Sequence, residues 1–212
     1  MNTINRAAVV STFCEECVWL YCLRKHFTDL FESGERRRLL LTEVAETFFH
    51  DLNLVLIDYL LLQMCKLTDP ASSGTNKDNL TTNYILGLNW TQETATRLHV
   101  ANQDLMRFRA RIDDARRKLI AHLDLRARLQ ALDLGSFSPE DEAEFWGALR
   151  VFIQAAHEEA IGGPLDLDVT MPDGDVANLI HRLRDAVDYD DLHGQDGAFL
   201  LSRYGHRRFD DA

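Results

Sequence analysis

Apolar residues recur at helical spacing through almost the whole first third of the chain. The i, i+3, i+4, i+7 pattern runs over residues 6–32 and again over residues 35–67, with Ser33 and Gly34 between the two stretches. Glycine commonly follows the last turn of a helix, because it adopts a positive φ without a steric penalty. Two long segments that each carry an apolar face have to bury those faces. We therefore expect long antiparallel helices to organise the fold.

Shorter helical patterns follow these two segments. The loop at residues 68–76 contains Pro70 and a Ser/Gly-rich run, and it separates them from the second long helix. Four further helices are expected, over residues 80–88, from 92 to between 121 and 131, from 139 to 161, and from 173 or 175 to about 189. The sequence contains no convincing strand. It therefore predicts an all-α fold, a helical bundle of five to six helices.

Several of these helices begin at residues that can cap a helix. Asp78 or Asn79 can cap the helix at 80–88. Ser138, which a proline and two acids follow, is a good N-cap for the next-to-last helix, because acids near a helix start favour the positive end of its dipole. Asp173 or Asp175 can cap the last helix.

Composition along the chain indicates one domain with a short tail. We expect residues 1–190 to form a single helical domain and residues 191–212, rich in Asp, Gly, His and Arg, to form a flexible tail. The run at residues 48–67 comes nearest to a membrane span, but Asp51 and Asp58 interrupt it and are costly in lipid. It is interpreted as a buried core helix. Charges also interrupt the first apolar stretch, so no signal peptide is predicted, and the protein is expected to be cytoplasmic with no membrane partner.

The cysteines favour core packing over a metal site. Cys14, Cys17 and Cys22 lie in one predicted helix, and Cys65 lies in the next. The alternative is a metal site that adds His26 to the first three. At roughly 100° per residue these side chains spread over about half of the helix circumference and cannot close on one ion. We therefore expect no metal and no cofactor, and treat the cysteines as small core residues.

Charge is distributed unevenly along the chain. The formal net charge is -11, and residues 138–212 carry 17 acidic and 6 basic side chains, which account for all of it. Residues 107–128, in contrast, hold 8 Arg or Lys and 3 Asp. Such a basic cluster can attract a phosphate-bearing ligand. The alternative is a salt-bridged helix surface, since two pairs have i,i+4 spacing. These pairs are Asp113–Arg117 and Asp114–Lys118.

Two segments carry a resemblance to a known superfamily. Residues 116–122 read Arg-Arg-Lys-Leu-Ile-Ala-His, which resembles the Arg, short spacer, His motif of HEPN proteins. Residues 67–81 begin Leu-Thr-Asp-Pro and end Asn-Leu-Thr, which is similar to the AbiU-like branch, linked to abortive infection of phage-attacked bacteria. The motif histidine is then His122. In the motif a polar residue usually follows the arginine, and Arg117 occupies that position here. The motif arginine is therefore either Arg116 or Arg117.

The resemblance implies a HEPN-like bundle and a metal-independent endoribonuclease, a toxin-like effector in phage defence that acts on RNA. In HEPN nucleases the arginine contacts the scissile phosphate and the histidine moves a proton. A guanidinium and an imidazole are suited to these two tasks. The residues expected in supporting roles are Asp113, Lys118 and Asp124.

Helix geometry makes a site within one chain difficult. On an ideal helix Arg116 or Arg117 points roughly 120–140° away from His122. The helix then has to end or kink near Ile120, or a second chain has to contribute. HEPN nucleases typically dimerise across this motif, so the resemblance implies a homodimer. The alternative function is a non-catalytic HEPN-like module that binds RNA or a protein, which Arg117 in place of Asn supports. The sequence leaves open the RNA target and whether a neutralising partner protein exists.

Overall fold

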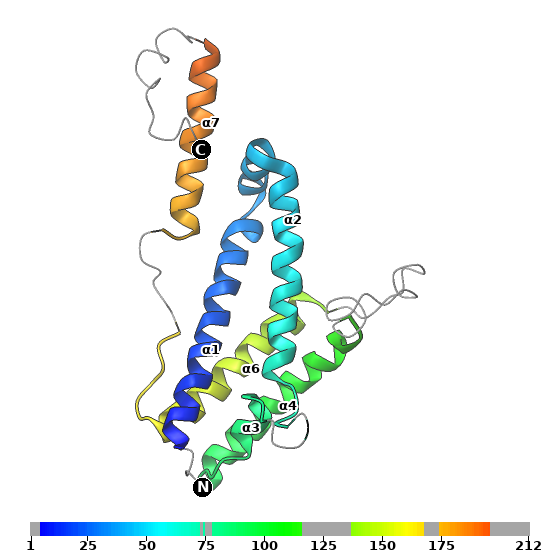
Figure 1. Cartoon of the computed structure of the whole chain (residues 1–212), viewed down its shortest axis with the longest axis vertical. Coiled ribbons are helices and arrows are strands. Elements are labelled where there is room, and N and C mark those ends of the chain that lie inside the picture. The colour runs from blue at the N-terminus through cyan, green and yellow to red at the C-terminus, as the bar shows by residue number, and fades with distance from the viewer. Residues whose placement is uncertain (1–4, 73, 75–77, 116–136, 168–173, 196–212) are drawn as a thin grey trace. The chain divides into compact units, whose positions relative to one another are not determined.

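The computed structural model describes residues 5–72, 74, 78–115, 137–167 and 174–195 (Figure 1). Its elements are α1 (Arg6–Phe27), the π-helical turn η1 (Thr28–Glu32), α2 (Glu35–Leu67), α3 (Thr82–Leu86), α4 (Gln92–Ala115), α6 (Pro139–Ala160) and α7 (Val176–Gln195). Ser72 and Asp78 form an isolated antiparallel bridge, and the remaining regular structure in these ranges is helical. The predicted all-α fold is confirmed.

Two predicted helix starts have the expected caps. The Ser138 hydroxyl accepts a hydrogen bond from the amide of Asp141 (3.2 Å), whose carboxylate accepts one from the amide of Ser138 (2.9 Å). This capping box satisfies amides that the first turn of α6 leaves without helical partners. Asp175 precedes α7, and its carboxylate accepts a hydrogen bond from the amide of Asn178 (3.2 Å). Of the two candidates, Asp173 and Asp175, the second is therefore the cap.

The structure corrects the prediction for α3. The helix begins two residues later and ends two residues earlier than expected, and its cap is Thr81, whose hydroxyl accepts from the amide of Tyr84 (3.2 Å). Asn79 instead forms hydrogen bonds with the preceding loop. Its amide donates to the carbonyl of Ala71 (2.8 Å), and its side chain donates to the carbonyl of Pro70 (2.9 Å). The loop after α2 therefore uses a residue that was expected to cap the helix.

The last helix is longer than predicted. α7 continues to Gln195, so it enters the segment 191–212 that was expected to be a flexible tail. Residues 176–193 contain neither glycine nor proline, which leaves no strong signal to stop a helix before Gly194. The rest of the predicted tail and the predicted end of the α4 helix lie outside the described residues.

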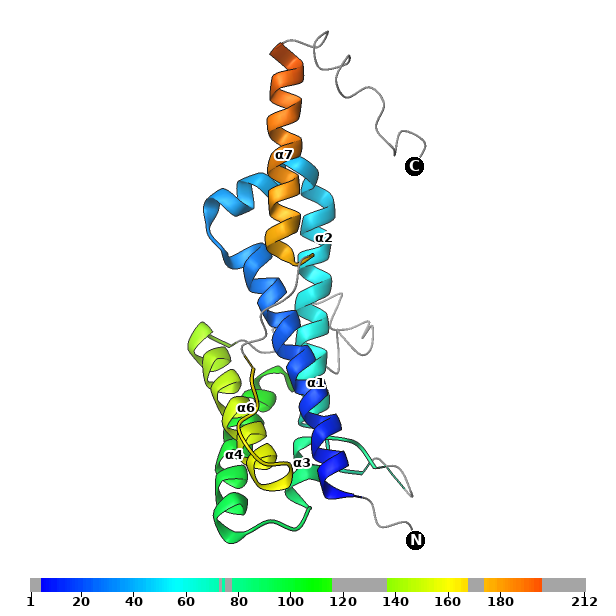
Figure 2. The same ribbon diagram turned by 90° about the vertical axis from the view of Figure 1, so that its left-hand side faces the viewer.

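The chain forms two compact units, residues 1–24 with 54–169, and residues 25–53 with 170–212. In the first unit α4 and α6 lie side by side (Figure 2). Phe13 of α1 packs edge-on against Phe152 of α6, with ring centroids 6.0 Å apart, and both side chains are fully buried. Phe145 of α6 packs on Phe108 of α4 at 5.0 Å. This unit includes both segments that resemble HEPN proteins.

The second unit has its own small core. Five buried residues form it, with α7 packing against η1 and the first half of α2. They are Leu30, Leu41, Phe49, Val176 and Ile180. Within this unit α2 is interrupted at Ala45, whose φ of -163° and ψ of 72° are not helical.

Helix α2 is less buried than predicted. Phe48, Leu54 and Val55 were expected in the core, yet they are 61%, 50% and 62% exposed. The buried apolar side chains lie on the other side of the helix and include Leu60 and Met64. The helix therefore buries one face only. By length and composition α2 is also the one helix in the described ranges that could cross a membrane, a test that a core helix can equally pass.

Candidate functional site

Five of the six predicted site residues lie outside the described residues, namely Arg116, Arg117, Lys118, His122 and Asp124. The sixth, Asp113, lies in the last turns of α4, and its carboxylate is 3.8 Å from Nη2 of Arg109. The described part of the chain therefore defines how α4 is held in place up to residue 115, directly before the motif.

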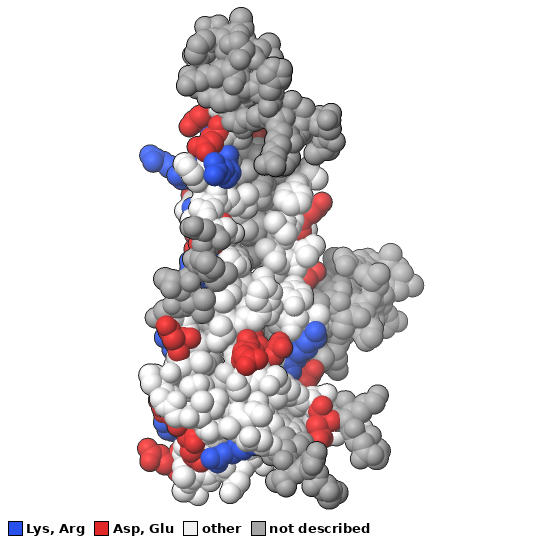
Figure 3. Space-filling view, turned by 60° about the vertical axis from the view of Figure 1, so that its left-hand side comes forward, with Lys and Arg blue, Asp and Glu red and all other residues white. Residues whose placement is uncertain are grey.

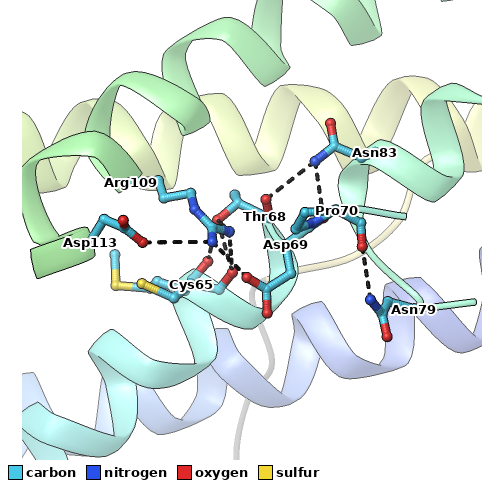
Figure 4. A network of polar contacts seen from close by, with 9 residues as sticks. Cys65, Thr68, Asp69, Pro70, Asn79, Asn83, Arg109 and Asp113 are labelled. Carbon is cyan, nitrogen blue, oxygen red and sulfur yellow. Dashed lines mark hydrogen bonds and ion pairs between the residues drawn. The ribbon is translucent and has the colours of Figure 1, made fainter. Parts of the chain in front are cut away.

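Arg109 joins α4 to the end of α2 (Figure 4). Its Nη1 donates to the carbonyl of Cys65 (2.9 Å) and to the hydroxyl of Thr68 (3.2 Å), and its Nη2 contacts the Asp69 carboxylate at 2.6 Å. The Arg109 side chain is only 13% exposed. Because hydrogen bonds between ionised groups in a partly dry site are among the stronger ones, we estimate that this network contributes about 2–3 kcal/mol. These residues, with Asp113, are called the Arg109 network below.

Asparagines hold the loop that follows α2 on the same side. The side chain of Asn83 donates to the carbonyls of Thr68 (3.2 Å) and Asp69 (3.0 Å), and Asn102 of α4 donates to the side-chain oxygen of Asn83 (3.4 Å). The Thr68 hydroxyl, almost fully buried, also donates to the last carbonyls of α2. The Leu-Thr-Asp-Pro segment thus has a structural role here. It fixes the end of α2 and the following loop against α4.

The sequence did not indicate this role of Arg109, although one signal for it is present. Arg109 lies four residues after the fully buried Leu105 and next to the buried Phe108. A cation on the buried face of a helix needs partners, because burying an unpaired charge is costly. The partners come from residues about forty positions earlier, which helix periodicity cannot identify.

The two other described arginines of the basic cluster are also paired with carboxylates. Arg107 contacts Asp104 at 2.9 Å and Glu144 at 3.9 Å, and Arg111 contacts Asp141 at 3.1 Å. On the face drawn in Figure 3, acidic and basic side chains are interspersed. The described arginines of the basic cluster are thus salt-bridged, whereas the two predicted i,i+4 pairs involve Arg117 and Lys118, which lie outside the described residues. Within the basic cluster at residues 107–128, a phosphate would therefore have to be bound by cations after residue 115.

The two described ends that flank the motif segment are held close to each other. Phe137, where the described chain resumes, packs on Phe108 of α4 with ring centroids 5.1 Å apart. The ion pair between Arg111 and Asp141 links α4 to α6. Aromatic packing and an ion pair thus hold together the described residues on either side of the segment 116–136.

All four cysteines are buried, as predicted. Burial, with a smaller contribution from the neighbouring Glu15, raises the pKa of the Cys14 thiol to about 11. Burial likewise raises the pKa of Cys17. Both are therefore neutral thiols at pH 7 and poor nucleophiles or metal ligands. Among the described residues, no group of three or more His, Cys, Asp or Glu side chains could hold a metal ion.

Comparison with known proteins identifies the family. Residues 6–179 match the family model of AbiU2, a HEPN family, from the first residue of α1 into α7. The match includes the Arg109 network and residues 116–122. No curated protein and no solved structure matches the chain. Since the family model covers most of its length, the chain belongs to the AbiU2 family of HEPN proteins.

Proposed function

We propose that the protein is a metal-independent endoribonuclease of HEPN type, a toxin-like effector of abortive infection that acts on RNA in the cytoplasm. The observation that carries the proposal is the family match, because residues 6–179 include the Arg-Arg-Lys-Leu-Ile-Ala-His motif. The described structure supports it indirectly. α4 leads into the motif, and the Arg109 network and the Phe108–Phe137 contact hold the two sides from which the motif segment departs and returns.

The proposed reaction uses the substrate's own nucleophile. The ribose 2′-oxygen attacks the neighbouring phosphorus, the bond from phosphorus to the 5′-oxygen breaks, and a 2′,3′-cyclic phosphate and a 5′-hydroxyl result. His122 takes the proton of the 2′-hydroxyl or gives one to the leaving 5′-oxygen, since imidazole titrates near neutral pH. Arg116 or Arg117 binds the non-bridging oxygens and stabilises the negative charge that develops on them.

A second chain completes the site in this proposal. Arg116 and Arg117 both stand apart from His122 on an ideal helix, so two copies of the motif facing each other supply what one lacks. Asp113 lies three residues before Arg116 and four before Arg117, and both spacings allow contact on a helix. Asp113 is therefore proposed to orient the arginine that binds the phosphate.

The second candidate function is a non-catalytic module that binds RNA or a partner protein. The pairing of Arg107, Arg109 and Arg111 with carboxylates favours a protein partner over RNA, because these pairs reduce the positive field next to the motif. Arg117 in the place of the usual polar residue favours the non-catalytic module.

Incubation of the purified protein with total RNA in excess EDTA separates the two functions. We expect cleavage that persists in EDTA and is lost in His122→Ala. The matched control is His99→Ala, an exposed histidine of α4, which should leave cleavage unchanged. Equal cleavage by wild type and His122→Ala would rule out the proposed site. Binding without cleavage, weakened by salt and by Arg116→Ala or Arg117→Ala, would support the binding module.

The same preparations test the pairing of chains. We expect a dimer at micromolar concentration by light scattering. We also expect mixing of His122→Ala with the inactive arginine variant to restore part of the cleavage, since each chain then supplies one intact group. A monomer that cleaves RNA would contradict the shared site.

A further inference from the structure

The second unit contains a cavity of about 300 Å³ beside η1 and the first half of α2. This volume is at the lower end of the range for small-molecule pockets, about 300–1,000 Å³. The cavity, called the α2 pocket below, is lined by Phe31, Arg38, Leu41, Thr42, Glu46, Phe49, His50 and Asn53. None of these residues belongs to the motif at residues 116–122, and the proposed nuclease function does not use them.

Two irregular helical segments form the walls of the pocket. Phe31 belongs to η1, where the Arg37 guanidinium donates to the carbonyl of Asp29 (2.5 Å). The other wall is α2, which is interrupted at Ala45 between pocket residues on either side. Neither η1 nor the α2 stretch around Ala45 contains a proline or glycine that would account for the irregularity. Such departures from regular helix are frequent at functional sites.

The polar side chains of the pocket are exposed, except for the half-buried Asn53, and they have few partners among the described residues. Arg38 contacts Glu35 at 3.3 Å, but both side chains are more than 70% exposed, and such surface pairs contribute little. No hydrogen bond or ion pair joins the side chains of Glu46, His50 or Asn53 to other described residues. These groups are therefore available to a ligand without breaking an interaction with another described residue.

The pocket has a cationic end, an acidic end and an apolar floor. Arg38 follows Arg36 and Arg37 in the first turns of α2, near the positive end of the helix dipole. Glu46 lies eight residues later, directly after the interruption at Ala45. The floor between them is buried or half-buried and comes from Leu41 and Phe49. A matching ligand carries an anion at one end, a flat ring in the middle and hydrogen-bond donors at the other end.

We propose that the α2 pocket binds a guanine nucleotide. Its phosphate accepts hydrogen bonds from the Arg38 guanidinium, and its base packs against the aromatic side chains of Phe31 and Phe49. The guanine edge presents two adjacent donors, N1–H and the N2 amino group, to the Glu46 carboxylate, whereas adenine has no such pair. The same chemistry belongs to a free mononucleotide and to an unpaired guanosine in RNA.

Calorimetric titration of the full-length protein with GMP and AMP tests this proposal. His122→Ala is used as the background, so that the result does not depend on whether the chain cleaves RNA. We expect GMP to bind at least about tenfold more tightly than AMP. Glu46→Gln should remove that preference, and Arg38→Ala should weaken GMP about tenfold while leaving guanosine, which lacks the phosphate, unchanged. The matched controls are Glu43→Gln and Arg36→Ala, which do not line the pocket.

A second titration identifies the source of the nucleotide. A fluorescent oligouridine with one guanosine should be displaced by GMP if the pocket takes an RNA nucleotide, and it should not bind there if the ligand is a free nucleotide. With either result, Glu46→Gln should remove the preference for guanine. The proposal is wrong if GMP fails to bind at millimolar concentration, or if its affinity is the same in folded Glu46→Gln and Arg38→Ala as in the two controls.

Discussion

The Arg109 network and the α2 pocket are both rich in charged groups, but those groups differ in where their partners come from. Arg109 is 13% exposed and is satisfied by a carbonyl, a hydroxyl and a carboxylate of the same chain. Glu46 and His50 are exposed and have no hydrogen-bond partner among the described residues. A polar group whose partners are internal stabilises the fold, and one without them is available for a ligand. Substitutions in the two regions should therefore separate stability from binding.

The largest expected effect is that of Arg109→Ala. The substitution removes the guanidinium that contacts the Asp69 carboxylate and one of the donors to the Cys65 carbonyl, so we expect the free energy of unfolding in urea to fall by about 2–3 kcal/mol. Arg109→Lys should recover little of this loss, because an ammonium cannot reproduce the planar fork that reaches all three partners.

The matched control for that experiment is Arg107→Ala. Arg107 is 60% exposed and forms ion pairs at the surface, so its loss should cost less than about 1 kcal/mol. Equal destabilisation by the two substitutions would remove the distinction between the buried network and the surface ion pairs.

A smaller loss is expected for Ser138→Ala. The substitution removes the hydroxyl that accepts from the amide of Asp141, and loss of such a cap typically costs about 1 kcal/mol. Thermal unfolding measures it. Ser138→Asp, which keeps an acceptor at the N-cap, should retain most of the stability, and a loss as large as that of alanine would show that the acceptor at the N-cap is not the cause of the loss.

The buried thiols predict a dependence of stability on pH. The pKa of Cys14 is raised to about 11 in the folded chain, so above pH 9 the unfolded chain releases this proton first. The contribution of the Cys14 thiol to the free energy of unfolding is complete below pH 9 and is lost as pH rises toward 11. Between pH 8 and pH 10 the loss is about 1 kcal/mol. Cys14→Ala should show a flatter pH profile in urea unfolding, and an unchanged profile would contradict the effect.

The smallest effect on stability is expected in the α2 pocket. Glu46→Gln and His50→Gln should change the free energy of unfolding by less than about 0.5 kcal/mol, because exposed side chains without partners are usually neutral to replace. Glu46→Gln should still abolish the preference for GMP. A loss of more than about 1 kcal/mol would mean that the pocket is a structural feature like the Arg109 network.

Sequence periodicity predicted the elements that depend on local signals. α1 with η1 ends at Ser33, and α2 covers the whole predicted range, because apolar spacing and Gly34 at a φ of +95° both act locally. The capping box at Ser138 is another local signal, contained in four residues. The family resemblance rested on short motifs, and the family match supports it.

Features that depend on distant partners were not predicted. Thr81 caps α3 in place of Asn79, because the Asn79 side chain donates a hydrogen bond to a carbonyl of the preceding loop. The interruption of α2 at Ala45 was not predicted, because no proline or glycine lies near it in the sequence. The pairing of Arg109 with Asp69 spans forty residues. The proposed catalytic residues Arg116, Arg117 and His122 lie outside the described residues, so their roles and their arrangement remain predictions.

Analysis of RNA ends tests the proposed nuclease most directly. RNA incubated with the wild-type protein in EDTA should carry new 2′,3′-cyclic phosphates and 5′-hydroxyls, because the 2′-oxygen is the proposed nucleophile. These ends should be absent with His122→Ala and present with His99→Ala. New 5′-phosphate ends, or cyclic ends that form equally with His122→Ala, would contradict the assignment of the site to the Arg-Arg-Lys-Leu-Ile-Ala-His motif.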